Sequence, residues 1–143
     1  MIKAHNKIMA NSQFGIGTHA GCITRRSHGT LKAHTLVCFD DNPNYVKTCS
    51  EADTPWGIVT HDALSPESLV CIQPLSSCGE TAKLKLSGVV KAGQFLCKHN
   101  GGTVRSLPTA EGFYQVIGIA LVDGLNDDYV EAITTLPYTM EVE

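Results

Sequence analysis

A ten-residue phrase occurs once in each half of this chain. Residues 29–38 read GTLKAHTLVC, and residues 88–97 read GVVKAGQFLC. Gly, Lys, Ala and Cys recur at matching positions, and the apolar positions between them stay apolar. Internal repetition constrains the architecture more than any other sequence signal, so the extent of this correspondence decides what the chain can fold into.

The correspondence continues through most of the chain. Each phrase is followed by a turn-rich segment, DDNPN at 40–44 and HNGG at 99–102, and then by VKT at 46–48 or VRS at 104–106. Further along, Gly57 matches Gly118 and Asp62 matches Asp123. The second copy gains three residues before Gly118, GFYQVIG against TPWG, and from there the alignment continues without a gap, pairing Leu69 with Val130, Ile72 with Ile133 and Leu75 with Leu136. The chain is therefore a tandem duplication of units at about 29–75 and 88–136.

Each unit has the pattern of several short strands. Apolar or alternating runs separated by Asp, Asn, Pro and Gly are typical of hairpins. The expected strands are 22–25, 35–39, 45–49, 56–61, 68–73, 83–86, 94–98, 103–107, 116–122 and 129–134. No stretch has helical periodicity, so few helices are expected. We predict an all-β fold, a small barrel or a sandwich, in which two pseudo-twofold-related units cover each other's open sheet edges.

The N-terminal residues 1–21 differ from residues 22–143, which are expected to form a single β-domain. Residues 1–21 are polar and contain isolated apolar residues: Ile2, Ile8, Met9, Phe14 and Ile16. Spaced apolar anchors on a segment that cannot build its own core suit docking into the grooves of a neighbour. A frayed terminus is the alternative.

Charge and hydropathy argue against several kinds of partner. The net charge is −3 and the Lys and Arg residues are dispersed, whereas a nucleic-acid-binding surface needs clustered positive charge. No run of apolar residues is long enough to predict a membrane span. Residues 1–17 lack the continuous apolar segment of a secretory signal, so we expect the cysteines to be reduced.

Six cysteines, residues 22, 38, 49, 71, 78 and 97, raise the question of catalysis or metal binding. The chain contains no C-x-x-C, H-E-x-x-H or G-x-S-x-G motif. Cys38 and Cys97 occupy matching positions of the two units, which favours a packing role. We therefore predict a non-enzymatic protein without metal or cofactor, and a Cys–His enzyme is the alternative. The Asp40–Asp41 pair is interpreted as a solvated loop, with weak calcium binding as its alternative.

Nearly the whole chain resembles the small cement, or decoration, proteins of tailed-bacteriophage capsids. The resemblance lies in G-x-V-K-A-G-x-x-L at 88–96, V-x-G-I-A-L-V-D-G at 116–124 and YVEAI at 129–133, with a second version in GTLKAHTL and WGIVTHDAL. It implies a virion structural protein that is assembled in the host cytoplasm, binds the outer surface of the major capsid protein, and stabilises the head, often as a homotrimer. An N-terminal segment commonly engages the capsid in such proteins, so the expected capsid-binding residues are Ile2, Ile8, Met9, Phe14 and Ile16.

A small β-barrel carrier or ligand-binding module is the alternative function. V-K-A-G-x-x-L is also similar to biotinyl and lipoyl barrels, which present a modifiable lysine at a hairpin tip. No such tip is expected between the two halves of this chain. The match to decoration proteins is itself incomplete, because His34 stands where the pattern has glycine.

Overall fold

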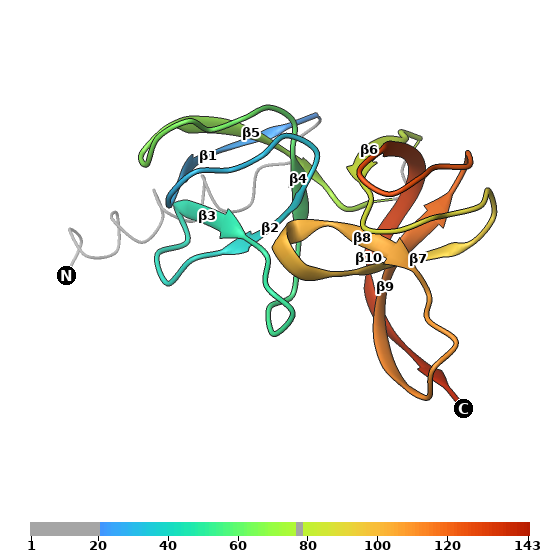
Figure 1. Cartoon of the computed structure of the whole chain (residues 1–143). Helices are drawn as coiled ribbons and strands as arrows, with labels where there is room; N and C mark the ends of the chain where they lie inside the picture. Colours follow the sequence, from blue (N-terminus) through green and yellow to red (C-terminus); the bar gives the residue numbers. More distant parts are fainter. Residues whose placement is uncertain (1–20, 77–78) are drawn as a thin grey trace.

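The computed structural model describes residues 21–76 and 79–143, and in them the only helical segment is one short 3₁₀ turn, η1 (Asn100–Gly102). Figure 1 shows two lobes side by side, the first built from β1 to β5 and the second from β6 to β10. The strands are β1 (Ile23–Ser27), β2 (Leu36–Phe39), β3 (Tyr45–Thr48), β4 (Gly57–Val59), β5 (Leu69–Pro74), β6 (Ala82–Lys85), β7 (Phe95–Lys98), β8 (Val104–Ser106), β9 (Gly112–Ala120) and β10 (Tyr129–Val142). The predicted all-β class is confirmed, and every predicted strand is present.

The two lobes repeat the same strand neighbours. β2 lies between β3 and β4 in the first lobe, and β7 lies between β8 and β9 in the second. Two matched glycines show why the repeat keeps certain residues. A Cβ on Gly57 would lie 2.3 Å from Cγ2 of Ile72. A Cβ on Gly118 would lie 2.2 Å from the carbonyl oxygen of Ile133. Both positions therefore require a residue without a side chain.

The lobes differ in how they close. In the first lobe β1 pairs in parallel with β3, and the sheet becomes a closed barrel. The matching contact in the second lobe is reduced to an isolated bridge between Leu86 and Val104, so β6 to β10 form an open five-stranded sheet. The expectation that each unit covers an open edge of the other is therefore wrong for the first unit, because its barrel has no open edge.

One apolar core runs through both lobes. Leu36 and Ile58 of the first lobe belong to the same buried cluster as Leu84, Leu96 and Val104 of the second. A separate cluster fills the first barrel, with the members Leu31, Val37, Val46, Val59, Ala63, Val70 and Ile72. Because successive side chains of a strand point to opposite faces, β2 places one face in the barrel interior and the other in the core between the lobes.

The predicted alignment of the last strands is wrong by one residue. Leu69 pairs with β1 at the position where Tyr129, not Val130, pairs with β6. A shift of one residue moves every side chain of a strand to the other face. Ile133, which the sequence alignment matched with the buried Ile72, is therefore 41% exposed.

β9 and β10 extend beyond the repeat. They stay paired as far as Gly112 and Val142, and Figure 1 shows this two-stranded ribbon projecting from the second lobe with the C-terminus at its tip. The pairing register shifts between Thr134 and Tyr138. Pro137 lies within this irregular stretch, where a residue without a backbone N–H is tolerated.

Candidate interaction surfaces

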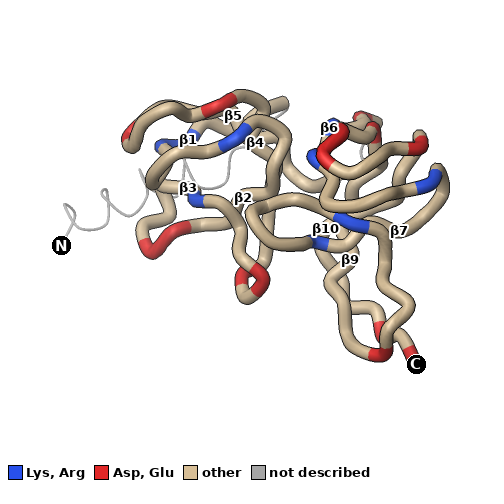
Figure 2. Tube along the Cα trace, viewed as in Figure 1, with Lys and Arg blue, Asp and Glu red and all other residues tan. Residues whose placement is uncertain are grey.

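The predicted capsid-binding residues Ile2, Ile8, Met9, Phe14 and Ile16 lie outside the described residues. In residues 21–76 and 79–143, no three His, Cys, Asp or Glu side chains gather as a metal site requires. No helix within these residues is long and apolar enough to cross a bilayer. Figure 2 shows Lys and Arg spread over both lobes rather than gathered on one.

The contact between the lobes is tight and partly made by the backbone. The N–H of Lys85 donates to the carbonyl oxygen of His34 at 2.9 Å. The Thr134 hydroxyl of β10 also donates to the Ser76 carbonyl oxygen, in the segment that follows β5, at 3.1 Å and accepts from the Ser76 N–H at 3.2 Å. Gly102 approaches so closely that a Cβ there would lie 2.7 Å from the Leu36 carbonyl oxygen. Complementarity at this level fixes the two lobes against each other.

The outer face of the second lobe carries an exposed apolar row made of Phe95, Ile119 and Ile133. These residues lie directly opposite one another on the adjacent strands β7, β9 and β10. Their exposed fractions are 37%, 38% and 41%. The sequence alignment paired Ile133 with the buried Ile72, so these three residues were not expected to share a face. The correct register places them on one face, but their exposure could not be read from it, because the matching residues Leu36 and Ile58 are buried.

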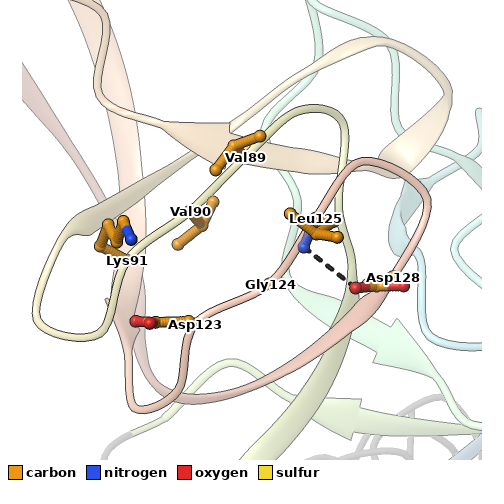
Figure 3. Close-up of a pocket in the computed structure, with 7 residues that line it drawn as sticks. All are labelled: Val89, Val90, Lys91, Asp123, Gly124, Leu125 and Asp128. Atoms are coloured by element: carbon orange, nitrogen blue, oxygen red, sulfur yellow. Dashed lines mark hydrogen bonds between the residues drawn. The ribbon is translucent and has the colours of Figure 1, made fainter.

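A hollow of about 230 Å³ lies beside this lobe's repeated loops, lined by Val89, Val90, Lys91, Asp123, Gly124, Leu125 and Asp128 (Figure 3). Its carboxylates are occupied in holding the loops. Asp123 accepts from the Ala92 N–H at 2.8 Å, and Asp128 accepts from the Leu125 N–H at 3.0 Å. In the first lobe, Asp62 makes the same contact to the Ala33 N–H at 2.7 Å. Repetition of this bond in both lobes indicates a structural role for the carboxylate.

The buried thiols are shielded from solvent, whereas a catalytic cysteine needs an environment that is accessible and stabilises the thiolate. Cys38, Cys49 and Cys97 are at most 3% exposed. Burial raises the pKa of each thiol, and that of Cys49 reaches about 12. Reactive cysteines instead have lowered pKa values, because the thiolate is the nucleophile. The Cys38 and Cys97 positions therefore fit the predicted packing role.

One serine–histidine contact needs an explanation. His99 Nδ1 lies 3.1 Å from the Ser87 hydroxyl oxygen. At the matching positions of the first lobe, His28 Nδ1 lies 2.8 Å from a carboxylate oxygen of Asp40. In each lobe the pair links a residue just after the first strand, β1 or β6, to the residue just after the second strand, β2 or β7. The same two positions are linked in both lobes by different residue types. This recurrence indicates a structural contact between strands rather than a nucleophile and its general base.

Comparison of the sequence with protein-family models and with curated proteins gave no match. The fold is similar to the crystal structure of the head fiber gp8.5 N base in bacteriophage phi29, with a TM-score of 0.63 and 16% sequence identity. The similarity covers 85% of this chain and 97% of that chain. The chain thus has the fold of a head-fibre base over nearly the whole of that structure.

Proposed function

We propose that this chain is a structural protein of a phage virion that binds the outer surface of the assembled head and stabilises it. The supporting observation is the fold similarity to a phage head-fibre base, which covers 97% of that chain. The resemblance of the repeat to capsid decoration proteins supports the same proposal. The raised pKa values of the Cys38, Cys49 and Cys97 thiols argue against these three residues as nucleophiles.

The stabilising mechanism is preferential binding. A protein that binds the assembled lattice of the major capsid protein better than its free subunits shifts the equilibrium toward the intact shell. An oligomer, for which the resemblance to decoration proteins implies three copies, adds avidity, because each chain after the first binds at high effective concentration.

The direct test uses heads assembled without this chain, to which the purified protein is added. We expect saturable co-sedimentation, density on the outer surface in electron micrographs, and DNA release at a higher temperature than from untreated heads. Heads of an unrelated phage serve as the control. The proposal is wrong if the matching heads neither bind the protein nor gain thermal resistance.

Residues 1–21 are proposed to contribute capsid anchors. Phe14→Asp and Ile8→Asp should each weaken binding to the heads, because a carboxylate cannot enter an apolar groove without losing its hydration. Asn11→Asp adds the same charge to the same segment without removing an apolar side chain, and it should bind like the wild type. Equal binding by all four proteins would assign the capsid contact to another surface.

The carrier alternative is tested by intact mass. The purified protein should have the unmodified mass of its sequence, 15.4 kDa. A stoichiometric acyl or biotinyl adduct on Lys32 or Lys91 would favour a carrier instead.

A further inference from the structure

We propose that the exposed apolar row Phe95, Ile119 and Ile133 binds the first lobe of a second copy of this chain. The inference builds on the oligomer in the proposed function and assigns it a surface. It depends on the internal duplication, because the sheet face that carries the row in the second lobe has a matching face in the first lobe, and only one of the two is covered.

In the first lobe, the face that matches the row is already covered. The strand pairings that join Phe95, Ile119 and Ile133 are repeated by Leu36, Ile58 and Gln73 on β2, β4 and β5. Leu36 and Ile58 are 0% and 1% exposed, and they share a buried cluster with side chains of the second lobe. A face of this kind is therefore already packed against a lobe of the same fold within this chain.

The uncovered version of this face is the more apolar one. Ile133 stands where the first lobe has Gln73, and Phe95 stands where it has Leu36. Water-facing positions of a sheet normally carry polar side chains. A row of three large apolar residues on the solvent side is the usual mark of an interaction surface.

The row is also continuous with the contact between the lobes. Tyr129 lies on the same side of β10 as Ile133 and is 45% exposed. Its ring meets the His34 ring of the first lobe edge-on, with centroids 5.2 Å apart. A partner seated on the row would therefore extend an interface that the chain already forms.

The packing within the chain favours the first lobe of a second copy as the occupant. The first-lobe face that contains Leu36 and Ile58 is covered by the lobe that follows it in the sequence. The same relationship, continued from the second lobe, places the first lobe of another copy on Phe95, Ile119 and Ile133.

The proposed contact is head to tail, because it joins different surfaces of the two copies. Within the chain, the second lobe covers the first through β6 and η1, which are not part of the row. Contacts of this type close into a ring when the rotation between copies permits. The lobes would then alternate around the ring.

The first experiment measures mass by light scattering. The wild-type protein should have a mass above 15.4 kDa, whereas Ile119→Lys should have the mass of a monomer. Phe113→Lys, which changes a residue that is 71% exposed on the projecting ribbon, should keep the wild-type mass. A far-UV circular dichroism spectrum like that of the wild type, with cooperative thermal unfolding at a midpoint lowered only by the lost association, would show that the fold of Ile119→Lys survives. A monomeric wild type, or an Ile119→Lys oligomer of wild-type mass, would overturn the proposal.

The second experiment identifies the occupant. A photo-crosslinking amino acid at position 119, in a mixture of ¹⁴N- and ¹⁵N-labelled chains, should give links between chains to residues 21–76. Links to residues 79–143 would indicate face-to-face pairing, and links to residues 1–20 would indicate the N-terminal segment. Links only to capsid protein would show that the row faces the head. Each of these three results would overturn the proposal.

Head binding by Ile119→Lys separates this inference from the proposed function. A monomeric variant that still binds heads, with lower avidity, leaves both standing. A wild-type oligomer that is disrupted by Ile119→Lys but never binds heads refutes only the proposed function.

Discussion

The backbone N–H of Lys85 donates a hydrogen bond to the carbonyl oxygen of His34 in the other lobe, at 2.9 Å. At the matching position of the first lobe, the N–H of Arg26 donates to Asn44 within its own barrel, at 3.0 Å. A buried or shielded backbone donor must be satisfied by some partner. The second lobe uses the first lobe as that partner, so its sheet needs no full β6–β8 pairing and stays open.

Substitutions at His34 should reveal the strain of its backbone. His34 has a φ of 65°, which β-branched residues tolerate poorly. We expect His34→Val to lower the free energy of unfolding by about 1–2 kcal/mol relative to His34→Gly, measured by urea titration. Both variants lose the ring contact with Tyr129, so their difference isolates the backbone. Gly93→Val, at a φ of 88° in the second lobe, is the matched substitution and should show a similar loss. Equal stability of His34→Val and His34→Gly would refute the strain.

Gly102 should be far more sensitive to substitution than its neighbour Gly101. Both have positive φ, 73° and 69°, so alanine at either position costs about 1 kcal/mol in backbone strain. Only at Gly102 does the added Cβ collide with the Leu36 backbone, and such overpacking costs about 1–3 kcal/mol more. Thermal unfolding of Gly102→Ala and Gly101→Ala gives the comparison. Matching midpoints would mean that η1 does not pack tightly on β2.

The Cys49 thiol should make stability depend on alkaline pH. Its pKa is raised by burial to about 12 from 9.0, so the unfolded state loses the thiol proton first as the pH rises. The stabilising effect is complete below pH 9 and disappears as the pH approaches 12; about 1.4 kcal/mol is lost by pH 10. Cys49→Ser keeps a donor for the Ser50 and Asp53 carbonyl oxygens but does not titrate. Urea titrations at pH 8 and pH 10 should therefore show a smaller decrease in the variant; a decrease as large as in the wild type contradicts the assignment.

The loop carboxylates should contribute equally in the two lobes. Asp62→Ala and Asp123→Ala each remove the acceptor for one backbone N–H, so each should lower the free energy of unfolding by about 1 kcal/mol. Asp41→Ala, in an exposed turn, should change stability little. Calorimetry of the three variants is sufficient. A large loss for only one of the first two would show that the lobes have diverged at this position.

Strand positions could be predicted from the sequence because they depend on local signals. Alternation of apolar residues and the Asp, Asn, Pro and Gly of the turns operate within a few residues of each other. Comparison of the two copies strengthened those signals, since Gly57 and Gly118 recur where a neighbouring strand comes too close for a side chain, through Cγ2 of Ile72 at Gly57 and through the Ile133 carbonyl oxygen at Gly118.

The register of the last strand could not be obtained from residue similarity. Aligning Ile72 with Ile133 matches identical residues, but the second copy is one residue shorter in the preceding loop. Glu67 and Asp127, with φ of 68° and 69°, mark equivalent turn positions and require the shift. Side-chain type gives no indication of such a conformation here, so residue similarity alone kept Ile133 aligned with Ile72.

The open second sheet and the projecting ribbon depend on information that the repeat does not contain. The sheet is open because the His34 carbonyl oxygen takes the Lys85 N–H, a contact between segments far apart in the chain. The ribbon from Thr135 to Val142 has no counterpart in the first copy. Its alternation is interrupted by Pro137, which a local pattern assigns to the end of a strand.

The division of β2 between two cores has a consequence for both lobes of this chain. A solitary first lobe would present Leu36 and Ile58 to water, and a solitary second lobe would lack an acceptor for Lys85. Each lobe therefore depends on the other, one to cover apolar side chains and the other to satisfy a backbone donor. Deleting or separating either lobe would therefore destabilise the other, so both copies of the duplicated unit are now required for the fold.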